Sequence, residues 1–108
     1  MANASQPKTG ILALDGEIDL YRSPQIKETM EPLISKKIER ILVDFSAVTY
    51  IDSSGLATMI ETLQRIQSYG GKFGMFGLRE NVKSIFEIAR LDQIFSIYPD
   101  ETAALAGA

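Results

Sequence analysis

The 108-residue sequence predicts a single α/β domain, in which a small mixed β-sheet, mostly parallel, carries about four helices. Short apolar runs alternate with amphipathic segments along the chain, which is the pattern of a sheet covered by helices. Hydrophobic residues make up 45% and charged residues 23% of the sequence, which is enough for a packed core. The length fits one ordinary domain over residues 1–108, and no linker or repeat divides it.

The N-terminal part of the chain predicts a leader followed by a first strand. Residues 1–9 are polar, and we expect them to form a flexible leader or a weak edge strand. The short apolar run Ile11–Leu14 is typical of a buried strand. Asp15 and Gly16 follow it directly and predict a turn that closes the strand.

A helix and a second strand are predicted next. Ser23 and Pro24 indicate the helix start, because a serine hydroxyl can cap a helix and proline suits the first helical position. Pro32 predicts a kink or an early end, since it removes one backbone hydrogen bond. The apolar segment 38–45 predicts a strand buried on both faces, and we expect residues 47–51 to form a tight connection after it.

The second half of the chain begins with the clearest helix. Asp52, Ser53, Ser54 and Gly55 open it, and Gly70–Gly71 ends it. Its apolar stripe recurs at helical spacing and consists of Leu56, Met59, Ile60, Leu63 and Ile66. The elements expected after it are a strand over 72–76, a helix over 80–89, a short strand within 91–98 and a brief helix that Asp100 caps.

Composition excludes several classes of activity. The sequence has no cysteine and no histidine, so disulfides, thiolate or histidine metal sites and a Ser-His-Asp triad are impossible. Fourteen acidic and eleven basic residues leave a net charge of -3, which argues against a nucleic acid partner. We therefore predict a binding domain rather than an enzyme, with no cofactor and no metal.

The N-terminus and the apolar runs indicate where the protein resides. The first ten residues lack the basic start and apolar run of a signal peptide. No apolar stretch approaches the roughly eighteen residues that cross a bilayer. We expect a cytoplasmic protein without a membrane partner, and a monomer.

The candidate functional segment is the junction over residues 50–55, between the second strand and the clearest helix. In open α/β sheets, binding sites gather where strands end and helices begin. The first turn of a helix carries free N–H groups and a partial positive charge, which favour an anion. Asp and Ser are also preferred cap residues, so Asp52 to Gly55 can be a cap alone. One hydroxyl is enough for a cap, however, which leaves the second one free.

In this setting the chain resembles the STAS domain of bacterial anti-sigma factor antagonists. The resemblance covers Ile11 to Leu105 and is most specific at Asp-Ser-Ser-Gly in this order of elements. The matching segments are Gly16-Glu17-Ile18-Asp19, Ile41–Phe45, Tyr50–Leu56, Gly70–Phe73 and Leu91–Phe95. The chain departs from the family at its polar leader, at Glu80–Asn81 and at Ala89–Arg90.

The resemblance implies a protein that switches partners. The phosphorylated residue would be Ser53, with Ser54 as the second-ranked acceptor and the favoured cap. Asp19, Asp52, Ser54 and Gly55 would belong to the surface that docks the kinase. That partner would be an anti-sigma factor that is itself an ATP-binding serine kinase. The unmodified protein would bind it and release a sigma factor, and a metal-dependent phosphatase of the PP2C type would remove the phosphate.

Other interpretations stay open. The chain could be a STAS subunit of a stress-sensing or lipid-transport assembly, in which the serine pair is structural. An enzyme that uses Ser53 with a lysine or an aspartate is disfavoured, because no lysine lies close to the motif. Asp19 could simply close a turn after the first strand.

Overall fold

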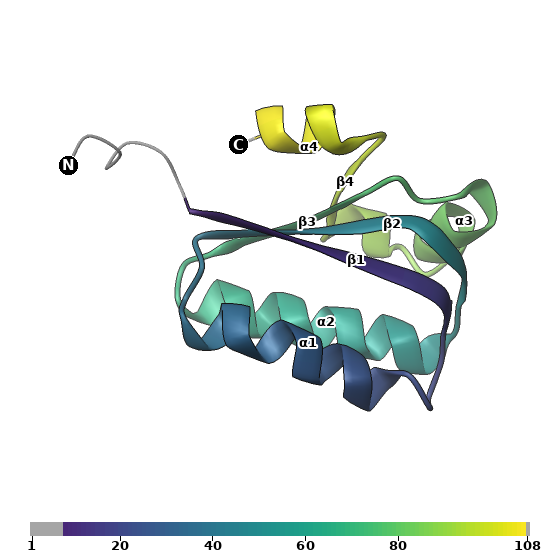
Figure 1. Ribbon diagram of the computed structural model, residues 1–108. Helices are drawn as coiled ribbons and strands as arrows, with labels where there is room; N and C mark the ends of the chain where they lie inside the picture. Colours follow the sequence, from purple (N-terminus) through teal and green to yellow (C-terminus); the bar gives the residue numbers. More distant parts are fainter. Residues whose placement is uncertain (1–7, 108) are drawn as a thin grey trace.

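Four parallel strands form one sheet in the computed structural model, which describes residues 8–107. The order across the sheet follows the sequence, and each neighbouring pair is parallel (Figure 1). The strands are β1 (Thr9–Ile18), β2 (Arg40–Ile51), β3 (Lys72–Phe76) and β4 (Ser96–Tyr98). The predicted α/β fold is confirmed, and the sheet of the described residues is parallel throughout rather than mixed. The expected leader, apart from Lys8 and Thr9, lies outside the described residues.

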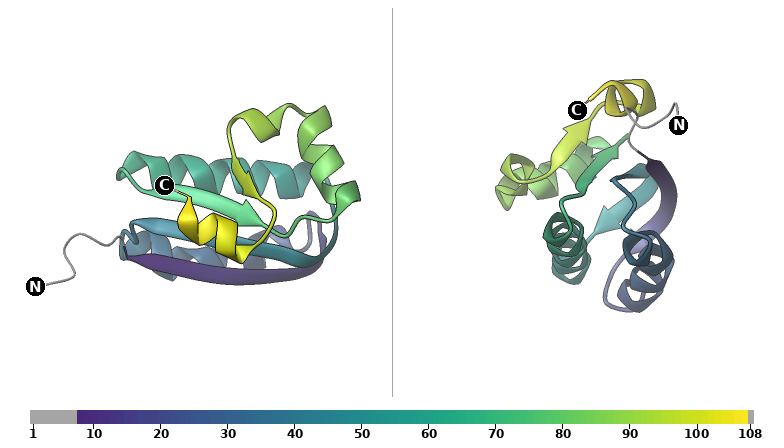
Figure 2. Two further views of the ribbon diagram at one scale, coloured as in Figure 1. Left: turned by 90° about the horizontal axis from the view of Figure 1, so that it is seen from above. Right: turned by 90° about the vertical axis from the view of Figure 1, so that its left-hand side faces the viewer.

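The predicted helices are present, and they cover both faces of the sheet (Figure 1). Helices α1 (Ser23–Ser35) and α2 (Ser53–Ser68) lie side by side on one face, and the short α4 (Glu101–Ala106) lies on the other (Figures 1 and 2). Helix α3 (Glu80–Ile88) lies at the end of the sheet where β2 and β3 finish (Figure 1). Within residues 8–107, every helix is too short or too polar to cross a lipid bilayer.

Strands β1 and β2 are longer than the sequence predicts. The turn expected at Asp15–Gly16 is wrong: the pairing register shifts there, Gly16 has a φ of 66°, and the strand continues to Ile18. The predicted connection over 47–51 is part of β2. Each strand is extended because the other offers hydrogen-bonding partners, as far as the pair Ile18 and Ile51. Both strands therefore end at one edge of the sheet.

Helix α1 begins at Ser23 and Pro24 as predicted, but its cap and its end differ from the prediction. The position before the helix is Arg22, which makes no side-chain cap, so the cap expected from Ser23 is wrong. Pro32 does not end the helix, which continues for three more residues to Ser35. A proline this close to the end removes only one hydrogen bond, while the buried Ile34 keeps the last turn against the core.

The segment after α3 forms less strand than expected. Arg90 takes a left-handed conformation, with a φ of 61°, and leads into a 3₁₀ turn, η2 (Leu91–Gln93), before the three residues of β4. Phe95 packs in an aromatic cluster, with its ring centroid 5.6 Å from that of Phe86 and 6.0 Å from that of Phe73. These packing contacts shorten the strand. The expected Asp100 cap is confirmed by the hydrogen bond that Ala103 N–H donates to its carboxylate, at 2.8 Å.

Candidate functional site

The ends of β1 and β2 bring the sequence-predicted residues Asp19 and Asp52 to one edge of the sheet. Asp52 follows the last residue of β2, and its N–H donates to the Ile18 carbonyl at the end of β1, at 3.1 Å. Asp19 is the residue after Ile18. The structure thus joins the two segments, which are more than thirty residues apart in the sequence.

Asp52 caps helix α2. Its backbone is extended, with φ −104° and ψ −173°, and its Oδ1 accepts a hydrogen bond from Gly55 N–H at 2.9 Å. The cap expected from Ser54 is therefore wrong, because the carboxylate takes the place that a serine hydroxyl would occupy. Ser54 is half-buried, and its carbonyl accepts a hydrogen bond from the Thr58 hydroxyl at 3.1 Å.

Ser53 is the first residue of α2, and its side chain is exposed. Among residues 8–107, its hydroxyl has no hydrogen-bond partner. The motif thus separates two tasks: Asp52 begins the helix, and Ser53 presents an uncommitted hydroxyl to solvent beside the helix N-terminus.

Gly55 is buried where α2 meets the ends of both strands. A Cβ atom built on Gly55 would lie 2.6 Å from the Ile18 carbonyl oxygen and 2.6 Å from Ile51 Cγ1, which no real side chain can do. Glycine therefore lets the first turn of α2 touch the strand ends. Because Gly55 is buried, it adds no exposed surface at this edge, and its close contacts place the first turn of α2, which carries Ser53, against the strand ends.

Asp19 closes a tight turn between β1 and α1. Its Oδ1 accepts hydrogen bonds from the N–H groups of Tyr21 and Arg22, both at 3.0 Å. The structure thus confirms that Asp19 closes a turn after the first strand. Asp19 is half-buried, so its carboxylate also contributes negative charge to the surface at this edge.

Three large apolar side chains are exposed at the same edge, and the candidate segment predicted from the sequence includes Tyr50 among them but not Leu20 or Tyr21. Leu20 and Tyr21 follow Asp19 and expose 64% and 88% of their surface, and Tyr50 precedes Asp52 by two residues and exposes 47%. The turn that carries the first two is held by Arg22, which donates to the Asp15 carbonyl at 2.8 Å. An aromatic residue just after Asp19, outside any apolar periodicity, was the available signal in the sequence.

Several acidic side chains lie at this edge of the sheet. Glu17 is exposed beside Asp19 and Asp52, while the nearby cation Arg22 is paired with Asp15 at 3.3 Å. In the part of the chain that the structure describes, no three acidic side chains gather closely enough to hold a metal ion. The arrangement can present a hydroxyl and an acidic, partly apolar surface to another protein.

Replacing Asp52 by alanine is expected to lower the free energy of unfolding by about 1 kcal/mol, because the Gly55 N–H loses its cap. Asp52→Asn keeps an acceptor oxygen and should lose only a few tenths of that amount. Urea titration of the three proteins measures the difference. Equal losses in both variants would contradict the capping role.

The fold and this edge together define the class: a small parallel α/β domain with a free serine hydroxyl and exposed aromatic residues suited to protein contact. The sequence profile of the STAS domain matches residues 1–104. The chain belongs to the STAS domain family.

The chain is similar to proteins named as anti-sigma factor antagonists. An anti-sigma-B factor antagonist of Listeria monocytogenes is 32% identical over 82 residues, which are 76% of this chain and 72% of the relative. The anti-sigma-B factor antagonist of Staphylococcus aureus is 26% identical over 86% of each chain. A crystal structure from Thermotoga maritima, assigned as an anti-sigma factor antagonist, superposes with a TM-score of 0.86 at 26% identity. It covers 92% of this chain, which in turn covers 86% of it.

Proposed function

We propose that this protein is an anti-sigma factor antagonist whose binding is controlled by phosphorylation of Ser53. Unphosphorylated, it binds an anti-sigma factor that is also an ATP-dependent serine kinase, and a sigma factor is released. The kinase phosphorylates Ser53 and ends the interaction, and a PP2C-type phosphatase restores it. The names of the relatives support the antagonist role.

One observation carries the phosphorylation step: the Ser53 hydroxyl is exposed and uncommitted within residues 8–107. The γ-phosphoryl group of ATP would pass to Ser53 Oγ, the hydroxyl proton to a base of the kinase, and ADP would leave. Hydrolysis of the ester by the phosphatase returns serine and inorganic phosphate. Ser54 is half-buried, which favours Ser53 as the acceptor.

The charge of the phosphate explains how modification would end binding. A phosphoserine carries about −1.5 to −2 charges at neutral pH. At Ser53 this charge would stand next to the Asp52 carboxylate and on the same edge as Asp19 and Glu17. A partner surface fitted to a bare hydroxyl would meet repulsion and would have to desolvate the phosphate.

Exposed apolar residues supply the attraction that the unmodified protein needs. Aromatic side chains are enriched at protein interfaces because they bury a large area with few rotatable bonds. Tyr21 and Tyr50 lie at the edge that presents Ser53. The partner would cover these side chains and the serine hydroxyl together.

Incubation with the cognate kinase and ATP is expected to place one phosphate on Ser53, located by peptide mass spectrometry. Ser54→Ala should remain a substrate, because its Asp52 cap and its Ser53 hydroxyl are intact. Ser53→Ala should take up no phosphate. Phosphate on Ser54 or at a distant residue in the wild-type protein would reject the proposal.

A further inference from the structure

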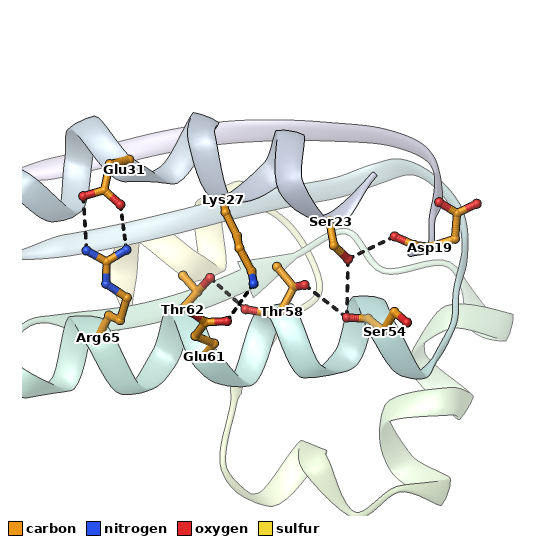
Figure 3. Close-up of polar contacts among 9 residues, drawn as sticks. All are labelled: Asp19, Ser23, Lys27, Glu31, Ser54, Thr58, Glu61, Thr62 and Arg65. Carbon is orange, nitrogen blue, oxygen red and sulfur yellow. Dashed lines mark hydrogen bonds and ion pairs between the residues drawn. The ribbon is translucent and has the colours of Figure 1, made fainter. Parts of the chain in front are cut away.

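Helices α1 and α2 meet along a line of hydroxyl groups, which we call the α1–α2 seam and define as Ser23, Thr58 and Thr62. All three side chains are buried. Figure 3 shows Ser23 of α1 beside Ser54, and Thr58 and Thr62 farther along α2, where the Thr62 hydroxyl donates to the Thr58 carbonyl at 2.8 Å. Buried polar groups in this position are unusual where two helices pack, since apolar side chains normally fill the contact.

Ion pairs also cross between the two helices, but at the surface. Lys27 pairs with Glu61 at 3.0 Å, and Arg65 pairs with Glu31 at 2.7 Å (Figure 3). The Arg65 guanidinium holds the pKa of the Glu31 carboxyl below its ordinary value through these hydrogen bonds. Exposed pairs of this kind contribute little to stability. The hydroxyls of Thr58 and Thr62 donate to carbonyls of their own helix, α2, so within the seam the Ser23 hydroxyl is the group that reaches from α1 to α2.

Ser23 occupies the end of the seam closest to Ser53. Its hydroxyl lies 3.0 Å from the Asp19 carbonyl oxygen and 3.5 Å from the Ser54 carbonyl oxygen (Figure 3). A serine hydroxyl has one proton, which is shared between two acceptors here: the stronger bond goes to the Asp19 carbonyl and the weaker one to the Ser54 carbonyl. Ser23 thus stands between the turn after β1 and the first turn of α2.

We infer that Ser23 is a positioning residue for Ser53, an inference that rests on the proposed function. Ser54 is the next residue to Ser53, so a contact with its carbonyl acts on the peptide segment that carries the reacting hydroxyl. The same Ser23 hydroxyl holds the Asp19 turn, which presents Leu20 and Tyr21. Ser23 therefore keeps the hydroxyl and the exposed apolar residues in one fixed arrangement for the kinase.

Ser23→Ala in the full chain is expected to raise the KM of the cognate kinase for this protein about fivefold, which corresponds to one ordinary net hydrogen bond. The kcat should change less than twofold, because the Ser53 hydroxyl itself is unchanged. Ser23→Thr keeps a hydroxyl and should restore the KM. Thr62→Val removes a seam hydroxyl more than one helical turn from Ser54, and its KM should equal that of the wild type.

A second measurement needs no kinase. Amide hydrogen exchange at Asp52 and Gly55, whose N–H groups bond to the Ile18 carbonyl and the Asp52 carboxylate, should accelerate about fivefold in Ser23→Ala. Thr62→Val should leave both rates unchanged. If Ser23→Ala does not fold, Ser23→Cys fills the same space with a weak donor and replaces it in both measurements.

The outcomes separate the inference from the proposed function. Wild-type KM and exchange rates in Ser23→Ala, with Ser53 still phosphorylated, would overturn the role of Ser23 alone. Faster exchange together with a wild-type KM would make Ser23 a structural residue and likewise overturn it. A wild-type protein that takes no phosphate at Ser53 would overturn the proposed function and, with it, the positioning role.

Discussion

Phosphorylation of Ser53 is expected to weaken binding to the anti-sigma factor about a hundredfold, a penalty of about 3 kcal/mol. Ser53→Asp adds one charge instead of about two and should weaken binding at least about tenfold. Ser53→Ala adds no charge and should bind as the wild type does. Isothermal titration calorimetry with the purified partner measures all of these affinities.

A control variant separates the effect of a charge at Ser53 from the effect of a more negative net charge. Gln64→Glu adds one negative charge on an exposed position of α2, about three turns from Ser53, and should change the affinity less than twofold. Raising the salt concentration should reduce the loss in Ser53→Asp, since mobile ions screen exposed charges. Equal binding by Ser53→Ala and Ser53→Asp would contradict the switch and favour a subunit of a larger assembly.

Gly55→Ala is expected to lower the free energy of unfolding by about 1–3 kcal/mol, because an added methyl group overpacks the contact with Ile18 and Ile51. The sign of this change in the free energy of unfolding distinguishes overpacking from helix propensity. In an ordinary helix interior, the same change is favourable by about 1 kcal/mol, since alanine has the higher helix propensity. Urea titration and thermal melting of both proteins measure the loss.

A control in the same helix tests that reasoning. Ala57→Gly at an exposed position of α2 should cost about 1 kcal/mol through propensity alone. Gly55→Ala should cost more than this and should also slow phosphorylation of Ser53, because α2 must move away from the strand ends. A Gly55→Ala protein at least as stable as the wild type would contradict the packing account.

Capping residues in the sequence predicted the helix ends that depend on neighbouring residues. The start of α2 at Asp-Ser-Ser-Gly, the end of that helix near Gly70 and the Asp100 cap agree with the structure, because capping acts within a few residues. The ends of β1 and β2 could not be predicted in this way. They depend on pairing between Ile18 and Ile51, which lie 33 residues apart.

The sequence selected Asp52 and Ser53 for the candidate site, but it did not predict how the residues around them are packed. The Asp52–Ser53 pair has a sequence motif. The exposure of Tyr21 and the burial of Ser23 instead follow from how the Asp19 turn packs beside α2. Sequence favoured a serine as the cap, and the structure gives that task to Asp52, whose carboxylate accepts the hydrogen bond from Gly55 N–H.

The division of tasks between Asp52 and Ser53 has a consequence for the stability of the phosphorylated form that we propose. The group that starts the helix is a carboxylate that a serine kinase leaves untouched, so esterifying its neighbour removes no hydrogen bond from the native fold. The free and esterified chains should therefore have nearly the same melting temperature. Under the proposed function, the two forms would then differ in surface charge rather than in stability, so repeated modification would not weaken the fold.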